Sequence, residues 1–595
     1  MKGSVQILEA ETGSGKSEAA IAAFLSMRKV GLVKGLYFGL PTRTSAVQMH
    51  GRVSTAIRKA LKDPPPVLLA VPGYMRLDDE DGKLVDGRNV LWDDDRISTA
   101  GWVAENAKRY LAAPIAVGTI DQLLLSVLDV KHGSMRWAAA ARSLLVVDEV
   151  HASDPYMFAL LSTVVRNHVN RGGHVLLMSA TLGCSMAHAC LSAVSGQMNA
   201  IPSLKEALTA PYPMIRTARP GKPWTEVSFP AEVRQKEVKV EASTIIDDPE
   251  SIADLAAFHA RANAKVLVIR NTVAGCVDVQ RLMEERLAPE MLMRAGRNMV
   301  PSPHHGRFAP EDRRALDIAV EAAFGKDSPR RGIVLCATQT VEQSLDIDAD
   351  IVITDICPVD VLLQRVGRLH RHTGRIPIVR PEGYEKPKVV VLVPSRPLTD
   401  FIAKPAHGIG PKRAYADVRV VELTLRKIRE MGTFTIPADN RLLVEECTHP
   451  ESLAALEYED KVFESHGMDV RGISYGDQTT ARLALRDGNW RPGDPIKSRS
   501  VDEHIMTRLG EVDLVVPFKD SLLTPFGEKV TYIKIPAWLS PRTRVKDTNV
   551  EGFTCLHDGS FSFTVEGESY TYSRFGLEKN GRDGLQPANR KGGSD

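Results

Sequence analysis

The chain has 595 residues, of which 43% are hydrophobic and 25% are charged, a composition typical of folded globular proteins and not of disordered ones. Because 76 Lys and Arg residues nearly balance 74 Asp and Glu residues, the net charge is only +2, and any nucleic-acid surface must be a local groove. No apolar run approaches the roughly 18–20 residues that span a bilayer, no secretion signal opens the chain, and none of the seven cysteines forms a CxxC pair, so we expect a cytoplasmic protein without a disulfide framework or zinc knuckle.

Short apolar runs alternate with amphipathic stretches over the first two thirds of the chain. Several runs are apolar throughout and rich in Val, Ile and Leu, which is typical of parallel strands buried on both faces. They predict strands at Gly35–Leu40, Leu144–Val147, His174–Met178, Lys265–Ile269, Gly332–Ala337, Asp350–Thr354 and Val389–Val393. Between them, Ser17–Lys29 and Glu311–Phe324 show helical periodicity. Strands that alternate with helices indicate an α/β fold with parallel sheets.

The predicted strands fall into two groups, which indicates two domains of similar architecture. We expect the first domain over residues 1–250 and the second over residues 251–398. The stretch from about residue 185 onward is poor in strand signal and rich in proline, so it is interpreted as the end of the first domain plus a linker. Residues 63–109 open with three prolines and carry acidic runs, a pattern typical of a surface insertion. Residues 399–595 are interpreted as a linker and an accessory domain of mixed helices and strands.

The strongest local signal is the run Ala10-Glu11-Thr12-Gly13-Ser14-Gly15-Lys16-Ser17. Its glycines let successive backbone N–H groups wrap around phosphate oxygens, and the helix that follows points its positive end at the same oxygens. Lys16 can neutralise the β- and γ-phosphates of ATP, and the hydroxyl of Ser17 can ligate Mg²⁺. Ala10 replaces the first glycine of the usual GxxxxGK[ST] pattern, but the turn glycines remain. The alternative is an ordinary Gly/Ser turn before an unrelated helix.

A second signal follows the predicted strand Leu144–Val147, which runs directly into Asp148-Glu149-Val150-His151. The end of such a strand lies at the carboxyl edge of the sheet, where ligands bind in open α/β folds. Asp148 is expected to hold Mg²⁺, directly or through water, and Glu149 to orient and deprotonate the attacking water. His151 is expected to couple this box to nucleic-acid-sensing segments. A structural role is the alternative, and the position about 130 residues after the phosphate loop favours catalysis.

An arginine-rich segment, Gln364-Arg365-Val366-Gly367-Arg368-Leu369-His370-Arg371, lies in the second strand group. Arg368 and Arg371 are three residues apart, so on a helix they would share one face. Two guanidinium groups presented together suit the charge that develops on a γ-phosphoryl group. Gln364 is expected to touch the γ-phosphate or the water. The alternative is a solvated basic helix, and the phosphate loop in a separate domain favours the catalytic interpretation.

The ordered set of motifs resembles the superfamily 2 helicases, which have two RecA-like lobes. A narrower likeness to the CRISPR-associated helicase of type I systems is carried by Leu40–Arg43, Val117–Gln122, Asp148–Asp154, Ser179–Thr181, Asn271–Val273, His305–Phe308 and Ala337–Asp346. It covers about residues 5–395 strongly and the remainder weakly. The resemblance implies two tandem RecA-like domains with a C-terminal accessory α+β region. It also implies an ATP hydrolase that drives a helicase on DNA.

The resemblance further implies roles for single residues. Contacts with the backbone of a single DNA strand are implied for Thr42, Arg43, Gly118, Thr119 and Asp121 in the first lobe, and for His305, Arg307, Thr338 and Gln339 in the second. Ser179 and Thr181 resemble the segment that couples hydrolysis to movement, and Asp346 matches a position near the nucleotide ribose. Because contacts with the backbone carry no base information, such a motor should be sequence-tolerant.

The family usually joins this motor to an N-terminal HD-type nuclease that holds metal ions through His and Asp side chains. Only nine residues precede Ala10, which is interpreted as leaving no room for that domain or for the upstream glutamine motif that reads adenine. His557-Asp558 lacks a helical context and is interpreted as a turn, and His304-His305 as a basic loop near a strand. We therefore expect a separate nuclease, or a split or truncated chain.

The expected function is that of an ATP-dependent single-stranded DNA translocase and helicase in type I CRISPR interference, with movement from 3′ to 5′ implied by the resemblance. The expected partners are single-stranded DNA, the crRNA-guided surveillance complex Cascade and a separate HD-type nuclease. Two alternatives stay open. One is a generic superfamily 2 helicase for DNA or RNA, and the other is a truncated, non-catalytic subunit that binds DNA and partners.

Overall fold

The computed structural model describes residues 3–11, 13–71, 76–78, 80–81, 83–85, 89–91, 107–130, 132–152, 154–197, 200–229, 235–342, 345–372, 379–485, 506–508, 513–541 and 550–581. The chain divides into two compact units. The first unit consists of Met1–Lys236, Arg419–Thr424 and Thr435–Leu509, and the second of Glu237–Val418, Leu425–Phe434 and Gly510–Asp595. Both units therefore include parts of residues 399–595, where the sequence pattern predicted a single accessory region.

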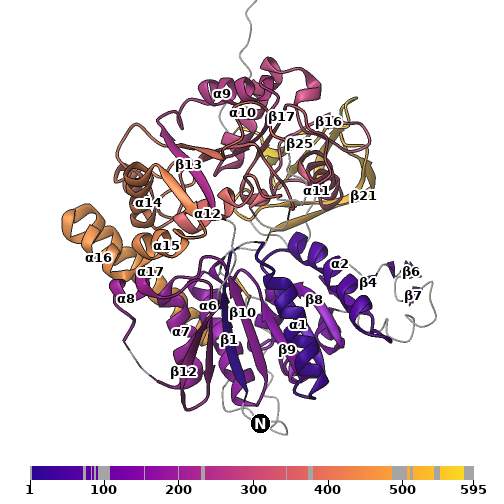
Figure 1. Ribbon diagram of the computed structural model, residues 1–595. Helices are drawn as coiled ribbons and strands as arrows, with labels where there is room; N and C mark the ends of the chain where they lie inside the picture. Colours follow the sequence, from indigo (N-terminus) through magenta and orange to yellow (C-terminus); the bar gives the residue numbers. More distant parts are fainter. Residues whose placement is uncertain are drawn as a thin grey trace, which may run out of the picture. The chain divides into compact units, whose positions relative to one another are not determined.

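A ten-stranded sheet forms the centre of the first unit (Figure 1). Its order is β12-β11-β1-β10-β9-β2-β8-β3-β4-β5. The bounds are β1 Ser4–Glu9, β2 Gly35–Leu40, β3 Val67–Ala70, β4 Arg76–Leu77, β5 Glu80–Asp81, β8 Ile115–Thr119, β9 Ser143–Val147, β10 His174–Ser179, β11 Met214–Arg219 and β12 Lys222–Ser228. All neighbours from β1 to β3 are parallel, so the carboxyl ends of these strands lie at one edge of the sheet.

Helices cover both faces of this sheet because successive side chains of each strand alternate between two hydrophobic clusters. Leu144 and Val146 of β9 pack with α1 and α2, whereas Leu145 and Val147 pack with α6 and α7. The helices of this unit are α1 Lys16–Lys29, α2 Arg43–Ala60, α4 Ile120–Leu124, α5 Gly133–Ala140, α6 Pro155–Asn170, α7 Cys184–Ser195 and α8 Leu204–Thr209. A separate two-stranded ribbon is formed by β6 Lys83–Val85 and β7 Asn89–Leu91.

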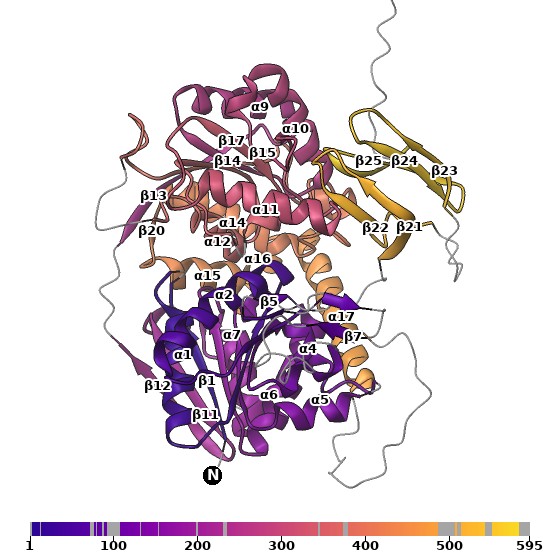
Figure 2. The same ribbon diagram turned by 90° about the vertical axis from the view of Figure 1, so that its right-hand side faces the viewer.

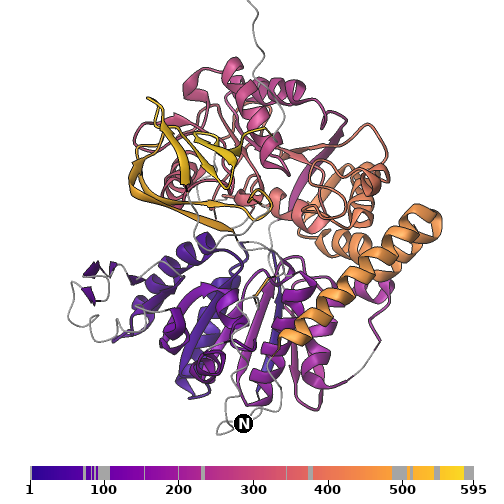
Figure 3. The same cartoon turned by 180° about the vertical axis from the view of Figure 1, so that it is seen from behind.

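Three helices from the far end of the sequence complete the first unit: α15 Asn440–Thr448, α16 Pro450–Glu459 and α17 Lys461–Ala484. The long helix α17, orange in Figure 3, packs against α6. Its Ala481 and Ala484 belong to the same hydrophobic cluster as the buried side chains of α6. The helix α14 Val418–Met431 contributes residues to both units.

Two predictions about the large sheet of the first unit are wrong. The stretch interpreted as a linker contains β11 and β12, which extend the sheet as an antiparallel pair next to β1. The sequence hid them because Pro220-Gly221 and Pro223 suggested a loop, whereas an edge strand tolerates proline. The predicted insertion at 63–109 contains β3, a fully buried parallel strand of the sheet. The acidic run Asp93-Asp94-Asp95 lies outside the described residues.

The second unit has a six-stranded sheet in the order β17-β14-β18-β19-β13-β20. The bounds are β13 Lys236–Ser243, β14 Lys265–Ile269, β17 Ile333–Ala337, β18 Ile351–Asp355, β19 Lys388–Leu392 and β20 Thr433–Ile436. The helices are α9 Pro249–Arg261, α10 Val273–Arg286, α11 Pro310–Phe324, α12 Val359–Val366 and α13 Asp400–Ala403, and a small ribbon is formed by β15 Arg294–Ala295 and β16 Val300–Pro301. The pairs from β17 to β13 are parallel, which confirms the predicted α/β class.

Antiparallel strands near the C-terminus, yellow in Figure 2, pack on the second unit. They are β21 Leu514–Leu523, β22 Lys529–Ile535, β23 Val550–Cys555, β24 Phe561–Val565, β25 Glu568–Ser573 and β26 Gly576–Lys579. Buried Asp312 of α11 accepts hydrogen bonds from the hydroxyls of Thr524, at 2.7 Å, and Tyr572, at 2.5 Å. These bonds attach the strands to the helix. His557-Asp558 forms the turn between β23 and β24, as predicted, and the carboxylate of Asp558 accepts from the amide of Ser560.

All seven cysteines are free thiols, as expected. Among the helices that the structure describes, none is both long and apolar enough to cross a bilayer.

Candidate nucleotide and nucleic-acid site

The phosphate loop follows β1 and leads directly into α1. Gly13 and Gly15 have φ angles of 85° and 90°, a conformation that side chains with a Cβ rarely adopt. Lys16 and Ser17 are largely buried at the start of α1, and Nζ of Lys16 donates to the carbonyl oxygens of Ala10, at 2.9 Å, and Glu11, at 3.2 Å. The ammonium group therefore lies inside the loop, where phosphate oxygens would take over its bonds. Thr12, also predicted to bind the nucleotide, lies outside the described residues.

The acidic box lies at the same sheet edge, directly after β9. The amide of Asp148 donates to the carbonyl of Gly39 on the neighbouring β2 at 3.0 Å. The carboxylate of Asp148 accepts the amide of Glu149 at 3.0 Å, and Glu149 has a left-handed φ of 53°. This strained backbone is typical of functional positions, where the surrounding structure fixes a side chain in an unusual direction.

The electrostatics of the box favour a bound cation. Burial of the Asp148 carboxyl, together with the neighbouring Glu149, raises the pKa of Asp148 to about 7, while Lys16 acts in the opposite direction. Oε2 of Glu149 is buried and makes no hydrogen bond. Two crowded carboxyls, one of which has an oxygen without a hydrogen bond, fit Mg²⁺, which prefers hard oxygen ligands. Asp148 and the hydroxyl of Ser17 would hold the ion, which would supply charge neutralisation for the phosphates.

A third segment at this edge, Ser179-Ala180-Thr181, is connected to both the acidic box and the phosphate loop. Nδ1 of His151 hydrogen bonds to Oγ of Ser179 at 2.7 Å and lies 3.5 Å from Oε2 of Glu149. The amide of Thr181 also donates to Oγ of Ser179, and the carbonyl of Ser179 accepts from the amide of Ala10. Ser179 therefore connects the acidic box to the phosphate loop, so a movement of one motif can be transmitted to the other.

Sequence reasoning missed a buried ion network beneath the phosphate loop. Glu9, the last residue of β1, is 1% exposed and pairs with Arg216 of β11 and, at 2.6 Å, with Arg441 of α15. Glu445 of α15 lies 3.4 Å from Arg441 and accepts the amide of Cys184 at the start of α7 at 2.9 Å. The sequence signal was only a charged residue at the end of an apolar strand, and its partners are too distant in the sequence to be inferred.

Asn440, the neighbour of Arg441, reaches the loop itself. Its Nδ2 donates to Oε2 of Glu11 at 2.6 Å. Tyr212, whose hydroxyl donates to the carbonyl of Ala180 at 3.1 Å, lies under the guanidinium of Arg441. Helix α15 thus holds the phosphate loop and the Ser179–Thr181 segment from one side.

Residues predicted to contact a DNA strand follow β2 and β8 at the same edge. Thr42 is the N-cap of α2 and accepts the amide of Ser45 at 3.1 Å, which places Arg43 in the first turn of this helix. Gly118 is required by packing, because a Cβ there would come within 2.4 Å of the carbonyl oxygen of Ala70. Thr119 ends β8 as the N-cap of α4.

Asp121 already has partners in this structure, and they come from the C-terminal part of the first unit. Its carboxylate pairs with Arg508 at 3.1 Å and accepts the hydroxyl of Thr507 at 2.8 Å. Arg508 also donates to the carbonyl of Pro41 at 2.9 Å. Binding of a strand by Asp121 stays a prediction, as do the roles of Thr42, Arg43, Gly118 and Thr119.

In the second unit, the arginine-rich segment is not the helix that the spacing predicted. Helix α12 ends at Val366, and His370 has a left-handed φ of 47°. Gln364 therefore lies on the helix, but Arg368 and Arg371 follow it and do not share a helical face. The spacing gave no sign that the helix stops at Val366, with Gly367 as its C-cap, before the first of these arginines.

Two of these arginines are bound by the unit itself. Arg365, which sequence reasoning left without a role, is fully buried and bonds to Glu342, Thr354, Asn271 and Tyr415. Arg368 is 6% exposed, and its guanidinium donates to the carbonyls of Leu345, at 2.7 Å, and Glu342. Arg365 and Arg368 therefore both stabilise the fold of this unit, and the sequence alone does not distinguish them from an arginine that binds a ligand.

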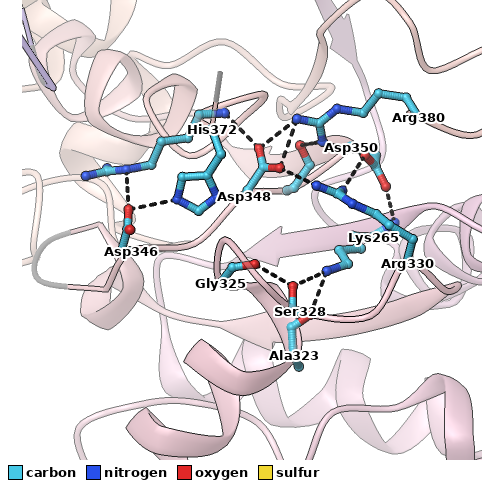
Figure 4. Close-up of polar contacts among 12 residues, drawn as sticks. Lys265, Ala323, Gly325, Ser328, Arg330, Asp346, Asp348, Asp350, His372 and Arg380 are labelled. Carbon is cyan, nitrogen blue, oxygen red and sulfur yellow. Dashed lines mark hydrogen bonds and ion pairs between the residues drawn. The ribbon is translucent and has the colours of Figure 1, made fainter. Parts of the chain in front are cut away.

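Arg371 is the more accessible of the two predicted arginines. Its Nε pairs with Asp346 at 2.8 Å, and its amide donates to Asp348 at 2.7 Å (Figure 4). The hydrogen bond from His372, assisted by the charge of Arg371, lowers the pKa of Asp346 to about 2. The predicted ribose contact and the predicted γ-phosphate contact are therefore paired with each other in this structure.

A buried acid–base cluster supports this pair. Arg380 donates to both oxygens of Asp348 at 2.9 Å and to Asp350 at 2.6 Å (Figure 4). Arg330 pairs with Asp348 from the other side at 2.9 Å. Because Asp348 also accepts the amide of Arg371, the cluster fixes the backbone that carries this arginine.

The strand contacts predicted for the second unit are largely buried. The amide of Thr338 donates to the carbonyl of His304 at 3.0 Å, and Nε2 of Gln339 donates to the carbonyl of Asn271 at 2.9 Å. The ring of His305 has no exposed surface and donates to the carbonyl of Phe575 at 3.0 Å. Contact between these residues and a strand stays a prediction. His304 forms a β-bridge with Ala337, so the segment lies near a strand as interpreted, but both rings are buried, and burial lowers the pKa of each, which argues against a basic loop.

Comparison with known proteins finds one family repeatedly. Residues 262–374 match the family model described as CRISPR-associated nuclease/helicase Cas3, C-terminal. The chain is 31% identical over 437 residues to the CRISPR-associated endonuclease/helicase Cas3 of Escherichia coli (strain K12), which covers 72% of this chain and 46% of that protein. It is also 31% identical over 482 residues to that of Thermus thermophilus, which covers 75% of this chain and 50% of that protein. The chain thus spans about half the length of these curated relatives.

The fold agrees with this kinship. The crystal structure of T. fusca Cas3 with ADP superposes with a TM-score of 0.67 at 26% sequence identity, and covers 89% of this chain and 58% of that one. The match confirms the predicted helicase family and its RecA-like architecture. The chain is a Cas3 helicase-type protein, similar to part of these longer nuclease/helicases.

Proposed function

We propose that this chain is an ATP-dependent translocase and helicase that acts on single-stranded DNA in type I CRISPR interference. The observation that carries the proposal is the connection of three motifs at one edge of a single sheet. Lys16 lies close enough to Asp148 to affect its pKa, and His151 joins the acidic box to Ser179. This arrangement can bind a triphosphate, activate water and pass the change to a neighbouring segment.

The residues of the first unit divide the work of hydrolysis. Backbone amides from Gly13 to Ser17 and the ammonium of Lys16 bind and orient the phosphates. Ser17 and Asp148 would hold Mg²⁺, which would supply neutralisation of the charge on the phosphate oxygens. Oε2 of Glu149, which has no hydrogen bond in this structure, takes the proton of the attacking water.

The nucleotide contacts predicted for residues of the second unit are part of the proposal. Gln364 and Arg371 would meet the γ-phosphate, and Asp346 would exchange its ion pair with Arg371 for a contact with the ribose. Arg368 would act indirectly, by positioning Glu342 and Leu345, because its guanidinium already donates to their carbonyl oxygens. Hydrolysis would then change the grip on the strand.

The strand is proposed to pass the N-terminus of α2 and the end of β8 in the first unit, and the Thr338–Gln339 segment in the second. Movement from 3′ to 5′, recruitment by the crRNA-guided surveillance complex and delivery of the strand to an HD-type nuclease are proposed from the likeness to Cas3. Contacts with phosphates make this binding weaken as salt rises.

The proposal is tested by ATP hydrolysis with and without single-stranded DNA. We expect DNA to stimulate the wild-type chain, and Lys16→Ala to lose at least about 100-fold of that rate because the charge on the phosphates is no longer neutralised. Lys34→Ala removes an exposed lysine of the same unit and should keep the full rate. Equal background rates for the wild type and Lys16→Ala would refute the proposal.

Substrate and direction need a second measurement. On forked substrates with one overhang, the wild type should displace the strand from a 3′ overhang and fail on a 5′ overhang. Stimulation by RNA alone would favour a generic RNA helicase instead, and binding without any turnover would favour a non-catalytic subunit.

A further inference from the structure

The C-terminal strands of the second unit present an aromatic side chain that the motifs do not explain. Trp538 follows β22 and is 65% exposed. Trp137 and Trp224, the other tryptophans that the structure describes, are buried and partly buried. Single exposed apolar residues are common on protein surfaces, so exposure alone carries no function. What distinguishes Trp538 is how it is held.

The turn that carries Trp538 is anchored on both sides. The amide of Leu539 donates to the carbonyl of Pro536 at 2.8 Å, and the side chain of Leu539 is buried. The carbonyl of Leu539 accepts the hydroxyl of Tyr570 at 2.7 Å and Nζ of Lys579 at 3.3 Å. The backbone is thus fixed, while the indole remains largely in water.

The indole is also fixed by a cation. The guanidinium of Arg307 lies 4.7 Å from the centre of the Trp538 ring. Arg307 itself is held, because its amide donates to Nδ1 of His305 at 3.2 Å and its carbonyl accepts the amide of Leu577 at 2.9 Å. An ordered ring that is already polarised by a cation loses little entropy when a second flat group stacks on it.

Arg307 belongs to the segment that leads to the predicted strand contacts of this unit. His304, three residues earlier, pairs with the end of β17, and its carbonyl accepts the amide of Thr338. The tryptophan therefore lies next to a segment that continues to the proposed strand-binding residues, although it comes from a part of the sequence that carries no motif.

We propose that Trp538, supported by Arg307, is a stacking platform for one base of the single strand. The inference rests on the proposed function and adds to it a contact with a base, where all other proposed contacts are with the backbone. Every base has a flat face, so the platform accepts any sequence. It requires a base, however, and this requirement distinguishes it from binding through charge.

The test compares two strands of equal charge. One is a fluorescently labelled oligothymidylate of about 15 nucleotides, and the other is an abasic strand of the same length. Fluorescence anisotropy gives the Kd of each strand for the wild type, Trp538→Ala, Trp538→Phe and the control Tyr458→Ala. Tyr458 is 94% exposed on α16 and belongs to no proposed site. Thermal unfolding confirms that the variants fold.

For oligothymidylate we expect Trp538→Ala to raise the Kd about 5- to 150-fold, Trp538→Phe to raise it less, and Tyr458→Ala to leave it unchanged. On the abasic strand, all four proteins should bind equally. An unchanged Kd for Trp538→Ala, or an equal loss of affinity for both strands, would overturn the inference. The proposed function would still stand in that case, provided that the wild type binds the strands. A wild type that binds neither strand would refute both.

Discussion

The phosphate-loop edge of the first unit and the arginine-rich segment of the second use charged groups in opposite ways. In the first, Asp148 is crowded by Glu149, and Oε2 of Glu149 has no hydrogen bond. In the second, the guanidinium of Arg365 is fully buried and bonded on all sides, and that of Arg371 is paired with Asp346. The first region leaves a carboxylate oxygen without a hydrogen bond, whereas the second pairs its guanidinium groups with its own carboxylates.

This difference shows how ligand-binding charge and structural charge can be distinguished. A group that waits for a ligand is left buried with incomplete bonds, which costs free energy until the ligand arrives. A group that holds the fold is saturated, so it can be removed only with its partner. Substitutions in the two regions should therefore separate activity from stability.

The largest effect is expected for Arg365→Met. It leaves the carboxylate of Glu342 buried without its partner, so the free energy of unfolding of the second unit should fall by about 3–5 kcal/mol. Urea denaturation measures this. Arg371→Ala, which breaks a partly exposed pair, should cost about 1 kcal/mol or less. Adding Glu342→Gln to Arg365→Met should restore part of the loss, and no restoration would contradict the role of the pair.

In the first unit, Glu149→Gln should have the reverse profile. We expect ATP hydrolysis to fall roughly 1,000-fold, because the amide cannot take a proton from water, while stability changes little. Steady-state hydrolysis and the Kd of a non-hydrolysable ATP analogue separate the two effects, and the Kd should stay within a few-fold of the wild type. Glu18→Gln, on the exposed side of α1, is the control and should keep the rate. A variant that hydrolyses ATP normally would exclude Glu149 as the base.

A buried carboxyl whose hydrogen bonds are satisfied should affect how the free energy of unfolding depends on pH. Burial raises the pKa of Asp312 to about 6, whereas its pKa in the unfolded chain is about 4. Between these values the unfolded chain releases the proton and the folded chain keeps it, so the free energy of unfolding should fall by at most about 3 kcal/mol as pH rises from 4 to 6.

Asp312→Asn should remove this fall, and Glu285→Gln, at an exposed position of α10, should leave it in place. Denaturation at a series of pH values provides the measurement. The same slope for the wild type and Asp312→Asn would assign the pH dependence to other groups.

A smaller loss of stability than that of Arg365→Met is expected in the network under the phosphate loop. Arg441→Met removes one of two cations from Glu9, while Arg216 remains, so the free energy of unfolding of the first unit should fall by about 2 kcal/mol. Urea denaturation and the KM for ATP report on stability and loop geometry. Arg219→Met, an exposed arginine of the same strand as Arg216, should change neither. A variant with wild-type stability would show that α15 does not brace the loop.

Where the sequence pattern was local, it predicted the structure well. The predicted strands Gly35–Leu40 and Lys265–Ile269 coincide with β2 and β14, because runs buried on both faces have few other solutions. The acidic box Asp148-Glu149 also directly follows a strand, β9, as predicted, whereas β1, the strand Ser4–Glu9 before the phosphate loop, was not predicted. The position of a helix end was predicted less well, since α12 ends at Val366 and leaves Arg368 outside the helix.

What the sequence could not provide is the set of distant partners. Asp121 meets Arg508, and Glu11 meets Asn440, but no periodicity connects such residues. A carboxylate in a motif looks the same whether it faces a ligand or an arginine from another part of the chain. Only the tertiary structure distinguishes the two cases.

The ion pair between Glu9 and Arg441 has a consequence for the order in which the protein is made. The two residues are 432 positions apart, and the whole six-stranded sheet of the second unit is encoded between them. During synthesis, the nascent first unit must therefore wait for its last helices while the second unit already emerges from the ribosome. Until α15 has been synthesised, the carboxylate of Glu9 can pair only with Arg216. The sheet that carries the phosphate loop should therefore be less stable in the nascent chain than in the complete protein.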